Sequence, residues 1–534
     1  MIGFEQLNPM QKKAVLHKDG AVLLLAGAGS GKTGALTVRI ADMLERGISP
    51  YNILAITFTN KAAKEMRERV DKLSGKAAQD VWISTFHSTC VRILRRDIDK
   101  IGFSRDFSIY DSDDQEKVMK EVFKELNMSI TDKLYTVRSA IGAISHLKEE
   151  MISWEDYLKE VDKADIRAWK TSRVYEAYQS RLMRNNALDF DDLIYKTVYL
   201  FRTRPDVLSV YQERFKYIMV DEYQDTNRLQ YLLMKQLVGE KGNICVVGDD
   251  DQSIYRFRGA TIENILNFER IYPGTKTIRL EQNYRSTSNI LNAANCVIQH
   301  NTERKGKTLW TKNGEGDKVQ VYTAENEQDE ASHIADVIGQ HLKEGGHLAD
   351  HAILYRMNAQ SAPIESYFTR AGIPHKIVGG QRFNDRKEVK DIHSYMSIVA
   401  NPRDDVRLRR IINEPARKIG ATTIEVIADL AAQQGISMLD VISHADQYAK
   451  LSRAIAPLFK FWDIYQKLQE SLETKTLDEF ASDVIEITGY RAMLEADAAK
   501  GHEDAADRLQ NLGQLVNNVK SYCDQHGEEA SLEG

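Results

Sequence analysis

The sequence predicts an α/β fold in which a parallel sheet carries a nucleotide-binding turn. Three observations support this prediction. Residues 21–47 join a buried apolar strand to a glycine-rich turn and then to an amphipathic helix that ends near Gly47. A second apolar strand runs directly into Asp221 and Glu222. Between these segments, roughly residues 106–189 show a period of about 3.6 residues, which predicts a mainly helical insertion.

The glycine-rich turn is typical of a P-loop, which wraps nucleotide phosphates with backbone N–H groups at a helix N-terminus. Its pattern normally begins with glycine, whereas this chain has Ala26 there. We expect Lys32 to reach the β- and γ-phosphates and the Thr33 hydroxyl to ligate Mg²⁺. An ordinary strand-to-helix turn is the alternative. The predicted ATP-binding residues of the turn are Ala26, Gly27, Ala28, Gly29, Ser30, Gly31, Lys32 and Thr33.

The acidic end of the second strand predicts a metal ligand and a catalytic base. A carboxylate that ends a core strand beside a P-loop strand holds Mg²⁺, and Asp221 has this place in the sequence. Glu222 follows it and can accept the proton of an attacking water. A solvated acidic strand end is the alternative, and chemistry alone assigns no role to Gln224 or Asp225. Together, the turn and the strand predict hydrolysis of a nucleoside triphosphate with Mg²⁺ as its metal.

Composition narrows the class of protein. A chain of 534 residues predicts about three or four domains, and 42% hydrophobic with 28% charged residues is typical of a soluble globular protein. Four widely spaced cysteines predict neither zinc nor disulfides. No apolar run approaches the ~18–20 residues of a membrane span. We therefore expect a cytoplasmic protein, and because the net charge is −6, nucleic acid must bind in a local groove.

Ordered motifs along the chain carry a resemblance to a known family. The segment "GDDDQSIYRFRGA" (248–260) places two aromatic rings among acidic, amide and arginine side chains of the kind found at phosphate sites. Nucleotide binding alone does not require these rings. It and its neighbours resemble the motifs of the UvrD/Rep/PcrA family of superfamily 1 DNA helicases. The matching segments are "LNPMQKKAV" (7–15), "ILAITFTNKAAKEMRERV" (53–70), "ISTFHS" (83–88), "ALDFDDL" (187–193), "VDEYQDTN" (220–227), "VVGDDDQSIYRFRGA" (246–260), "LEQNYRSTSNIL" (280–291) and "LYRMNAQS" (354–361).

The resemblance implies two RecA-like parallel-sheet motor domains with two mainly helical inserted domains. The first motor domain is expected at 1–105 and 190–276, and the second, incomplete, at 277–378 with strands at 319–324 and 351–356. The insertions are expected at 106–189 and 379–534. Within the second insertion, "RLRR" (407–410) is expected either to contact the backbone of duplex DNA or to form a solvated helix face.

The resemblance also implies roles for single residues. Gln11 would read adenine, Gln252 would sense the γ-phosphate, and Arg285 would neutralise the phosphoryl group in transfer, with Arg258 as a further nucleotide contact. The ring pair Tyr255 and Phe257 would stack on bases of single-stranded DNA. The alternative for Phe58 and Phe190 is packing in the apolar core. For Arg285 the alternative is a surface ion pair, and for His87 it is a purely structural role. The predicted DNA contacts are Phe58, Asn60, Thr85, His87, Phe190, Tyr255 and Phe257.

The predicted function is that of an ATP-dependent 3′→5′ DNA helicase and single-strand translocase in repair or replication. Its partners would be single-stranded DNA, duplex junctions and repair or replication proteins. We expect no membrane association, and we expect the protein to be a monomer or a weak dimer. The family's last two motifs are absent, so we expect a truncated or proteolysed form. A second chain or a natural short form would also explain it. Alternative functions are a nucleotide-gated DNA-binding module, a helicase–nuclease subunit or an RNA helicase.

Overall fold

The computed structural model describes two compact units of the chain. One comprises Met1–Gly314 with Lys387–Gly534, and the other Glu315–Arg386. The described residues are 3–129, 134–357, 360–378, 383–499, 504–527 and 530–532, and within them the side chains of residues 76, 77, 241, 258, 385, 504 and 525 are left out.

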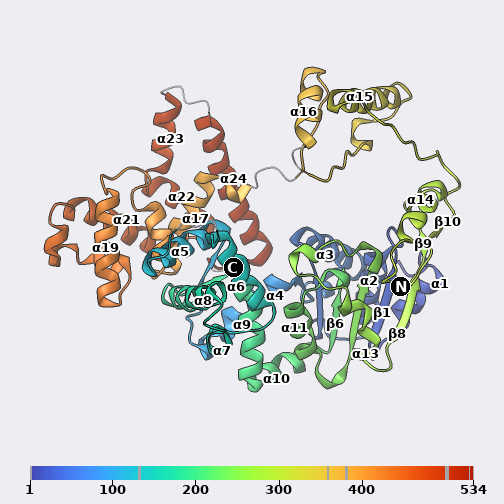
Figure 1. Ribbon diagram of the computed structural model, residues 1–534, viewed down its shortest axis with the longest axis horizontal. Helices are drawn as coiled ribbons and strands as arrows, with labels where there is room; N and C mark the ends of the chain where they lie inside the picture. Colours follow the sequence, from blue (N-terminus) through green and yellow to red (C-terminus); the bar gives the residue numbers. More distant parts are fainter. Residues whose placement is uncertain are drawn as a thin grey trace. The chain divides into compact units, whose positions relative to one another are not determined.

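A six-stranded parallel sheet forms the core of the larger unit (Figure 1). Its strand order is β3-β2-β6-β7-β1-β8. All neighbouring strands are parallel, so their carboxyl ends lie at one edge of the sheet. The strands are β1 (Val22–Ala26), β2 (Ile53–Thr57), β3 (Trp82–Thr85), β6 (Tyr217–Val220), β7 (Ile244–Gly248) and β8 (Lys276–Leu280).

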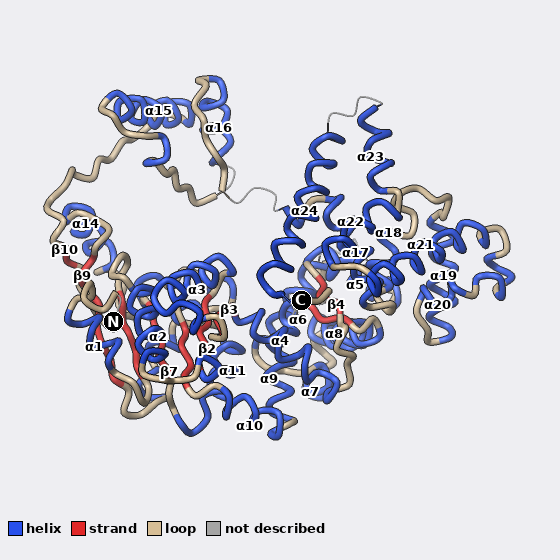
Figure 2. Tube along the Cα trace, turned by 180° about the vertical axis from the view of Figure 1, so that it is seen from behind, coloured by secondary structure: helices blue, strands red, loops and turns tan. Residues whose placement is uncertain are grey.

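Helices cover both faces of this sheet, and Figure 2 shows its strands among them. Successive side chains alternate between two apolar clusters: Leu23 and Leu25 join one, Val22 and Leu24 the other. Strands buried on both faces require continuous apolar runs, which is what these strands have. The first cluster includes side chains of α4 (Phe86–Asp97), α9 (Phe190–Thr203), α10 (Pro205–Arg214) and α11 (Arg228–Val238). The second includes side chains of α1 (Pro9–Leu16), α2 (Lys32–Glu45) and α3 (Asn60–Ser74).

Strand β8 lies across the predicted domain boundary between residues 276 and 277. It pairs with β1 along its whole length, from Lys276 opposite Val22 to Leu280 opposite Ala26. The first sheet is therefore one strand wider than the predicted boundary allowed. The elements around and after β8 are α12 (Glu263–Leu266), α13 (Phe268–Ile271), β9 (Gln282–Asn283), α14 (Ser288–Ile298) and β10 (Trp310–Thr311).

The stretch from 106 to 189 is mainly helical, as the periodicity predicts. Its helices share a core of their own, which includes Phe123, Tyr175 and Tyr178. A short parallel pair of strands, which the sequence pattern did not reveal, frames the stretch. The elements are β4 (Ser108–Tyr110), α5 (Ser112–Glu125), α6 (Val137–Glu149), α7 (Trp154–Glu160), α8 (Ile166–Arg184) and β5 (Ala187–Asp189).

The chain after residue 386 is also largely helical, as predicted. Among the described residues, no helix combines the length and apolar character needed to cross a membrane. The helices are α17 (Lys387–Ala400), α18 (Asp405–Ile411), α19 (Ala421–Gln434), α20 (Met438–Ser443), α21 (Ile455–Thr474), α22 (Leu477–Ile487), α23 (Tyr490–Ala499) and α24 (Asp504–His526).

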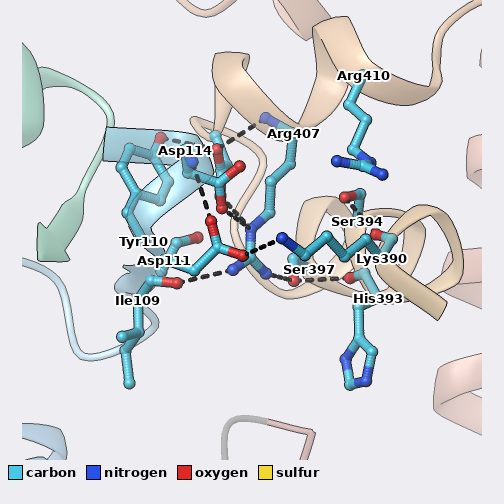
Figure 3. Close-up of polar contacts among 12 residues, drawn as sticks. Ile109, Tyr110, Asp111, Asp114, Lys390, His393, Ser394, Ser397, Arg407 and Arg410 are labelled. Atoms are coloured by element: carbon cyan, nitrogen blue, oxygen red, sulfur yellow. Dashed lines mark hydrogen bonds and ion pairs between the residues drawn. The ribbon is translucent and has the colours of Figure 1, made fainter. Parts of the chain in front are cut away.

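A polar junction joins these two helical regions (Figure 3). Tyr110 Oη donates to Asp404 Oδ1 at 2.8 Å, and both residues are buried. Asn401 Nδ2 donates to Ser108 Oγ at 3.0 Å and to two backbone carbonyls. Arg407 Nη2 donates to the Ile109 carbonyl at 2.7 Å. Val406 also packs into the apolar core of residues 106–189, and because the polar groups of the junction are buried, each must stay paired.

The arginines of "RLRR" form ion pairs and not the solvated helix face that was one of the two expectations, while their contact with duplex DNA stays a prediction. Arg407 lies 3.8 Å from Asp114 and 3.6 Å from Asp404, measured between nitrogen and carboxylate oxygen. Arg409 pairs with Glu121 and Arg410 with Asp391. These arginines are mostly buried because carboxylates of neighbouring helices surround them. Arg407 and Arg409 thereby join the second helical region to the first, whereas Arg410 pairs within the second region.

The two strands predicted in the smaller unit were wrong. Residues 319–324 and 351–356 carry no strand hydrogen bonding, and the unit's helices are α15 (Glu327–Lys343) and α16 (Ser361–Arg370). The alternating apolar pattern is real, but a strand also needs a neighbour for its backbone groups. Val321 and Leu354 are 91% and 94% exposed, so no packing compensates for the missing neighbour.

We predict that Tyr110→Phe lowers the free energy of unfolding by about 1–3 kcal/mol, because Asp404 loses a buried hydrogen-bond donor. Chemical denaturation followed by circular dichroism measures this change. Tyr322 is a matched control, since its hydroxyl donates to Asp329 on the surface. Tyr322→Phe should have no measurable effect. If Tyr110→Phe is as stable as the unmodified chain, the junction does not persist in solution.

Candidate nucleotide and DNA site

The glycine-rich turn has the backbone geometry of a phosphate-binding loop. It starts where β1 ends and leads into α2, whose first residue is Lys32. Gly29 and Gly31 have φ values of +63° and +77°, a region in which a side chain is strained. Ala26 is fully buried at the end of β1, where a methyl group fits. The turn thus presents the unpaired N–H groups of a helix start, which suit an anion.

Two oxygen ligands suited to Mg²⁺ lie next to this turn. Thr33 Oγ1 donates to Asp221 Oδ2 at 3.2 Å, which joins α2 to the end of β6. Burial, and then the nearby charge of Glu222, raise the pKa of Asp221 to about 6. A hydroxyl beside a buried carboxylate fits a hard divalent cation. The positive charge of that cation would stabilise the ionised form of Asp221, which burial and Glu222 disfavour. The donor set therefore fits the predicted metal.

Glu222 is held between two donors. Its Oε2 atom accepts from Lys32 Nζ at 2.9 Å and from Gln224 Nε2 at 2.9 Å. The backbone of Glu222 has φ +51°, a left-handed conformation that is uncommon for a residue other than glycine. Such strain is typical of functional positions. The Glu222 carboxylate is thus held in one orientation beside the P-loop lysine.

Gln224, to which the sequence assigned no role, connects the acidic strand end to the segment after β7. Its Oε1 atom accepts from the Asp249 backbone N–H at 2.9 Å while its Nε2 atom binds Glu222. Asp249 in turn accepts a hydrogen bond from Gln252 Nε2. Polar contacts therefore run without a break from Lys32 to Gln252. A glutamine between two acidic segments gives no local signal in the sequence for this link.

Other predicted nucleotide contacts also lie at the turn. Gln11 Nε2 donates to the Ser30 carbonyl at 2.9 Å, so the predicted adenine reader touches the P-loop. The Arg285 Cβ atom lies 2.8 Å from the position that a Cβ on Gly29 would take. The Arg258 side chain lies outside the described residues. The roles of these three residues stay predictions.

The sequence reasoning missed Asn283, which binds the P-loop directly. Its Nδ2 atom donates to the Ala28 carbonyl at 2.7 Å, and the neighbouring Tyr284 N–H donates to the Gly29 carbonyl at 2.9 Å. Both residues stand in the quoted segment 280–291 beside Arg285, which was the only member assigned a role. The backbone contacts place this segment against the phosphate-binding turn.

Most of the predicted DNA contacts follow the carboxyl ends of β2, β3 and β7 in the six-stranded sheet, whereas Phe190 follows β5 of the short strand pair. His87 and Phe190 lie 5.4 Å apart between ring centroids, and Phe190 is 54% exposed. Asn60 is exposed at the start of α3. Tyr255 and Phe257 form a stacked pair with centroids 6.0 Å apart and are 38% and 74% exposed. Exposed rings next to a nucleotide site are suited to stacking on bases.

Two of the predicted DNA contacts have structural partners. Phe58 packs edge-on against Phe86 at 5.9 Å and adjoins the apolar core. Thr85 Oγ1 accepts from the Ser88 N–H at 3.1 Å and so caps α4, with little surface exposed. His87 is largely enclosed, and burial lowers its pKa. Phe58 thus has the core packing that was its alternative and Thr85 caps a helix, while the contacts of both residues with DNA stay predictions.

A buried ion pair sets the position of Phe190, the first residue of α9. Lys148 Nζ lies 2.6 Å from Asp189 Oδ2 and 3.0 Å from Asp192 Oδ1, with all three side chains at most 2% exposed. Asp189 also caps α9, since its Oδ1 atom accepts from the Asp192 N–H. Removing one partner of a buried pair is strongly destabilising. This network fixes the start of α9, and with it the exposed ring.

The parallel sheet, the glycine-rich turn and the acidic strand end together define a P-loop NTPase. The chain matches the UvrD/REP helicase N-terminal domain over residues 7–273 and the UvrD-like helicase C-terminal domain over residues 278–533. It therefore belongs to the UvrD-like helicase family. It is 50% identical over 519 residues to the ATP-dependent DNA helicase PcrA of Staphylococcus epidermidis, covering 97% of this chain and 70% of that protein. Identity to ATP-dependent DNA helicase PcrA of Staphylococcus aureus is 48% over 517 residues, with 97% and 70% covered.

We predict that Asp191→Asn makes the chain more stable at pH 7.5 but not at pH 4. Burial, and then the charge of Asp189, raise the pKa of Asp191 to about 6 from the ordinary 3.8. Between these values the folded chain binds more protons than the unfolded chain, so stability falls as pH rises. The asparagine variant avoids this loss and should gain about 1–2 kcal/mol above pH 6.

Thermal unfolding at several pH values measures the difference between the Asp191 variant and the unmodified chain. Asp80→Asn is a matched control at an exposed carboxylate and should change stability equally at both pH values. A stability difference for Asp191→Asn that does not vary with pH would contradict the prediction.

Proposed function

We propose that this chain is an ATP-dependent DNA helicase that uses ATP hydrolysis to move along single-stranded DNA and separate duplex strands. The observation that carries the proposal is the unbroken polar path from Lys32 through Glu222 and Gln224 to Asp249 and Gln252. Three residues beyond its end stands the stacked and exposed ring pair Tyr255 and Phe257. The path therefore joins phosphate chemistry to a surface suited to bases.

The residues of the turn divide the chemical work. When bound, ATP with Mg²⁺ supplies the phosphoryl group that is transferred to water. The backbone of the P-loop and the Lys32 ammonium bind the phosphates, while Thr33 and Asp221 hold the metal. Glu222 accepts the proton of the attacking water. Because Lys32 also pairs with Glu222, phosphate and Glu222 compete for one ammonium, which links nucleotide binding to release of the base.

The ring pair supplies affinity for DNA of any sequence. Every base has an aromatic face, so stacking on Tyr255 and Phe257 does not depend on which base is present. The proposal places His87, after β3, and Phe190, after β5, in the same role. The family match favours a helicase over a nucleotide-gated binding module. The 3′→5′ polarity, a part in repair or replication and a cytoplasmic location stay predictions of the family resemblance.

We predict that Lys32→Ala lowers DNA-stimulated ATP hydrolysis by about 100-fold or more, because a charge that stabilises the transferring phosphoryl group is lost. Phosphate release with and without single-stranded DNA measures turnover. Lys12→Ala is a matched control, since Lys12 pairs with Glu5 near the surface. Hydrolysis that survives Lys32→Ala would show that the P-loop assignment is wrong. Nucleotide and DNA binding without turnover in the unmodified chain would instead indicate the binding module.

We predict that Tyr255→Ala combined with Phe257→Ala weakens single-strand binding by about 2 kcal/mol or more, because each ring contributes about 1–3 kcal/mol of stacking. Fluorescence anisotropy of a labelled oligonucleotide measures the affinity. Tyr51 is a matched control: it is also exposed, but it precedes β2 and so lies at the opposite edge of the sheet. Equal losses for Tyr51→Ala and for the double variant would refute a specific stacking role.

A further inference from the structure

Lys307 lies at the centre of three aspartates that follow β7. Its ammonium is 2.7 Å from Asp249 Oδ1, 2.5 Å from Asp250 Oδ1 and 2.7 Å from Asp251 Oδ2. The Lys307 side chain is 1% exposed. Three carboxylates this close together repel one another unless a cation lies between them. The lysine supplies that cation from a segment 57 residues further along the chain.

The segment around Lys307 binds the aspartates through two further groups. Arg304 donates to both carboxylate oxygens of Asp251 at 2.7 Å. This bidentate contact fixes the orientation of the two side chains relative to each other. The Lys305 N–H donates to Asp250 Oδ2 at 2.7 Å. Burial opposes the charge on Lys307, but the aspartates outweigh it and raise the pKa of Lys307. The cluster is therefore a closed ionic contact and not an open metal site.

Asp249 connects this contact to the predicted γ-phosphate sensor. One of its carboxylate oxygens faces Lys307 and the other accepts from Gln252 Nε2. Its backbone N–H donates to Gln224, which leads on to Glu222. With both oxygens engaged, the Asp249 carboxylate cannot turn without breaking a charge-assisted bond. The orientation of Gln252 thus depends on the ammonium of Lys307.

The same segment also touches the P-loop. A Cβ atom on Gly27 would lie 2.0 Å from a methyl group of Leu309, so Leu309 packs directly on the turn. Residues 304–309 therefore contact both the phosphate-binding turn and the aspartates that hold Gln252. They lie within the part of the chain that matches the UvrD-like helicase C-terminal domain. The segment thus connects the phosphate-binding turn to the aspartates that hold Gln252.

We propose that Lys307 is a positioning residue for nucleotide sensing: through Asp249 it holds Gln252 in the orientation that distinguishes a nucleoside triphosphate from a diphosphate. The inference rests on the proposed role of Gln252 in ATP hydrolysis. It adds that the sensor is held from residues 304–309, outside the segment that contains it. A purely structural role, in which Lys307 only neutralises the three neighbouring acids, is the reading that the experiment must exclude.

The test compares the affinities of the 534-residue chain for a non-hydrolysable ATP analogue and for ADP, measured by isothermal titration calorimetry. Lys307→Met should reduce the preference for the triphosphate by roughly ten-fold, the size of a coupling between residues in one network. Gln252→Ala should reduce it similarly. The double variant should be no worse than either single variant, because both remove the same contact.

Additive losses in the double variant would overturn the proposal, as would equal weakening of both nucleotides by Lys307→Met. Because Lys307→Met leaves the buried Asp249 and Asp250 without their ammonium partner, Asp249→Asn is a second variant that keeps the lysine and should lose the same preference. Unchanged discrimination in Asp249→Asn would also overturn it. Lys305→Met is the matched control, since its ammonium pairs with Glu269 instead, and it should bind both nucleotides normally. If the unmodified chain shows no triphosphate preference, the proposed function of Gln252 fails, whatever Lys307 does.

Discussion

Backbone hydrogen bonds between parallel strands decide where the site residues meet. Residues of β7 pair with β1 and with β6, and β2 pairs with β6, so turns that are far apart in sequence leave the sheet at one edge. The P-loop, the acidic strand end and the segment with the ring pair are three of these turns. A shift of one residue in any register would turn the apolar side chains of that strand to the wrong face. The core and the site thus depend on the same pairing.

Polar contacts then convert this shared edge into a connected site. Each connection uses a side chain that bonds in two directions: Glu222 to Lys32 and Gln224, and Asp249 to Gln252 and Lys307. Such networks are worth more than separate pairs because each bond orients the next. The same logic holds at Lys148, where a buried charge fixes the start of α9 under Phe190. Apolar packing holds the helices against the sheet, and buried charged groups fix the orientation of the candidate site side chains.

Local features of the site could be predicted from the sequence, and long-range features could not. The P-loop and Asp221 follow from apolar runs that end in glycines or acids, which is a property of adjacent residues. Lys307 looks like a solvated lysine in the sequence, because its aspartates are more than fifty residues away. The contacts of Arg407 with Asp114 and of Arg409 with Glu121 are equally distant in sequence, so no local pattern reveals them. Residues 319–324 have a true strand pattern, but a pattern cannot supply the neighbouring strand.

The left-handed backbone of Glu222 implies a trade-off between activity and heat resistance. A residue with a Cβ atom loses about 1–2 kcal/mol in this conformation, a loss that glycine avoids. The chain therefore tolerates a less stable fold at the position where a carboxylate must face the P-loop. Selection for stability alone would favour glycine at residue 222 and would abolish the proposed catalytic base. A thermostable relative that keeps the glutamate must gain its stability elsewhere.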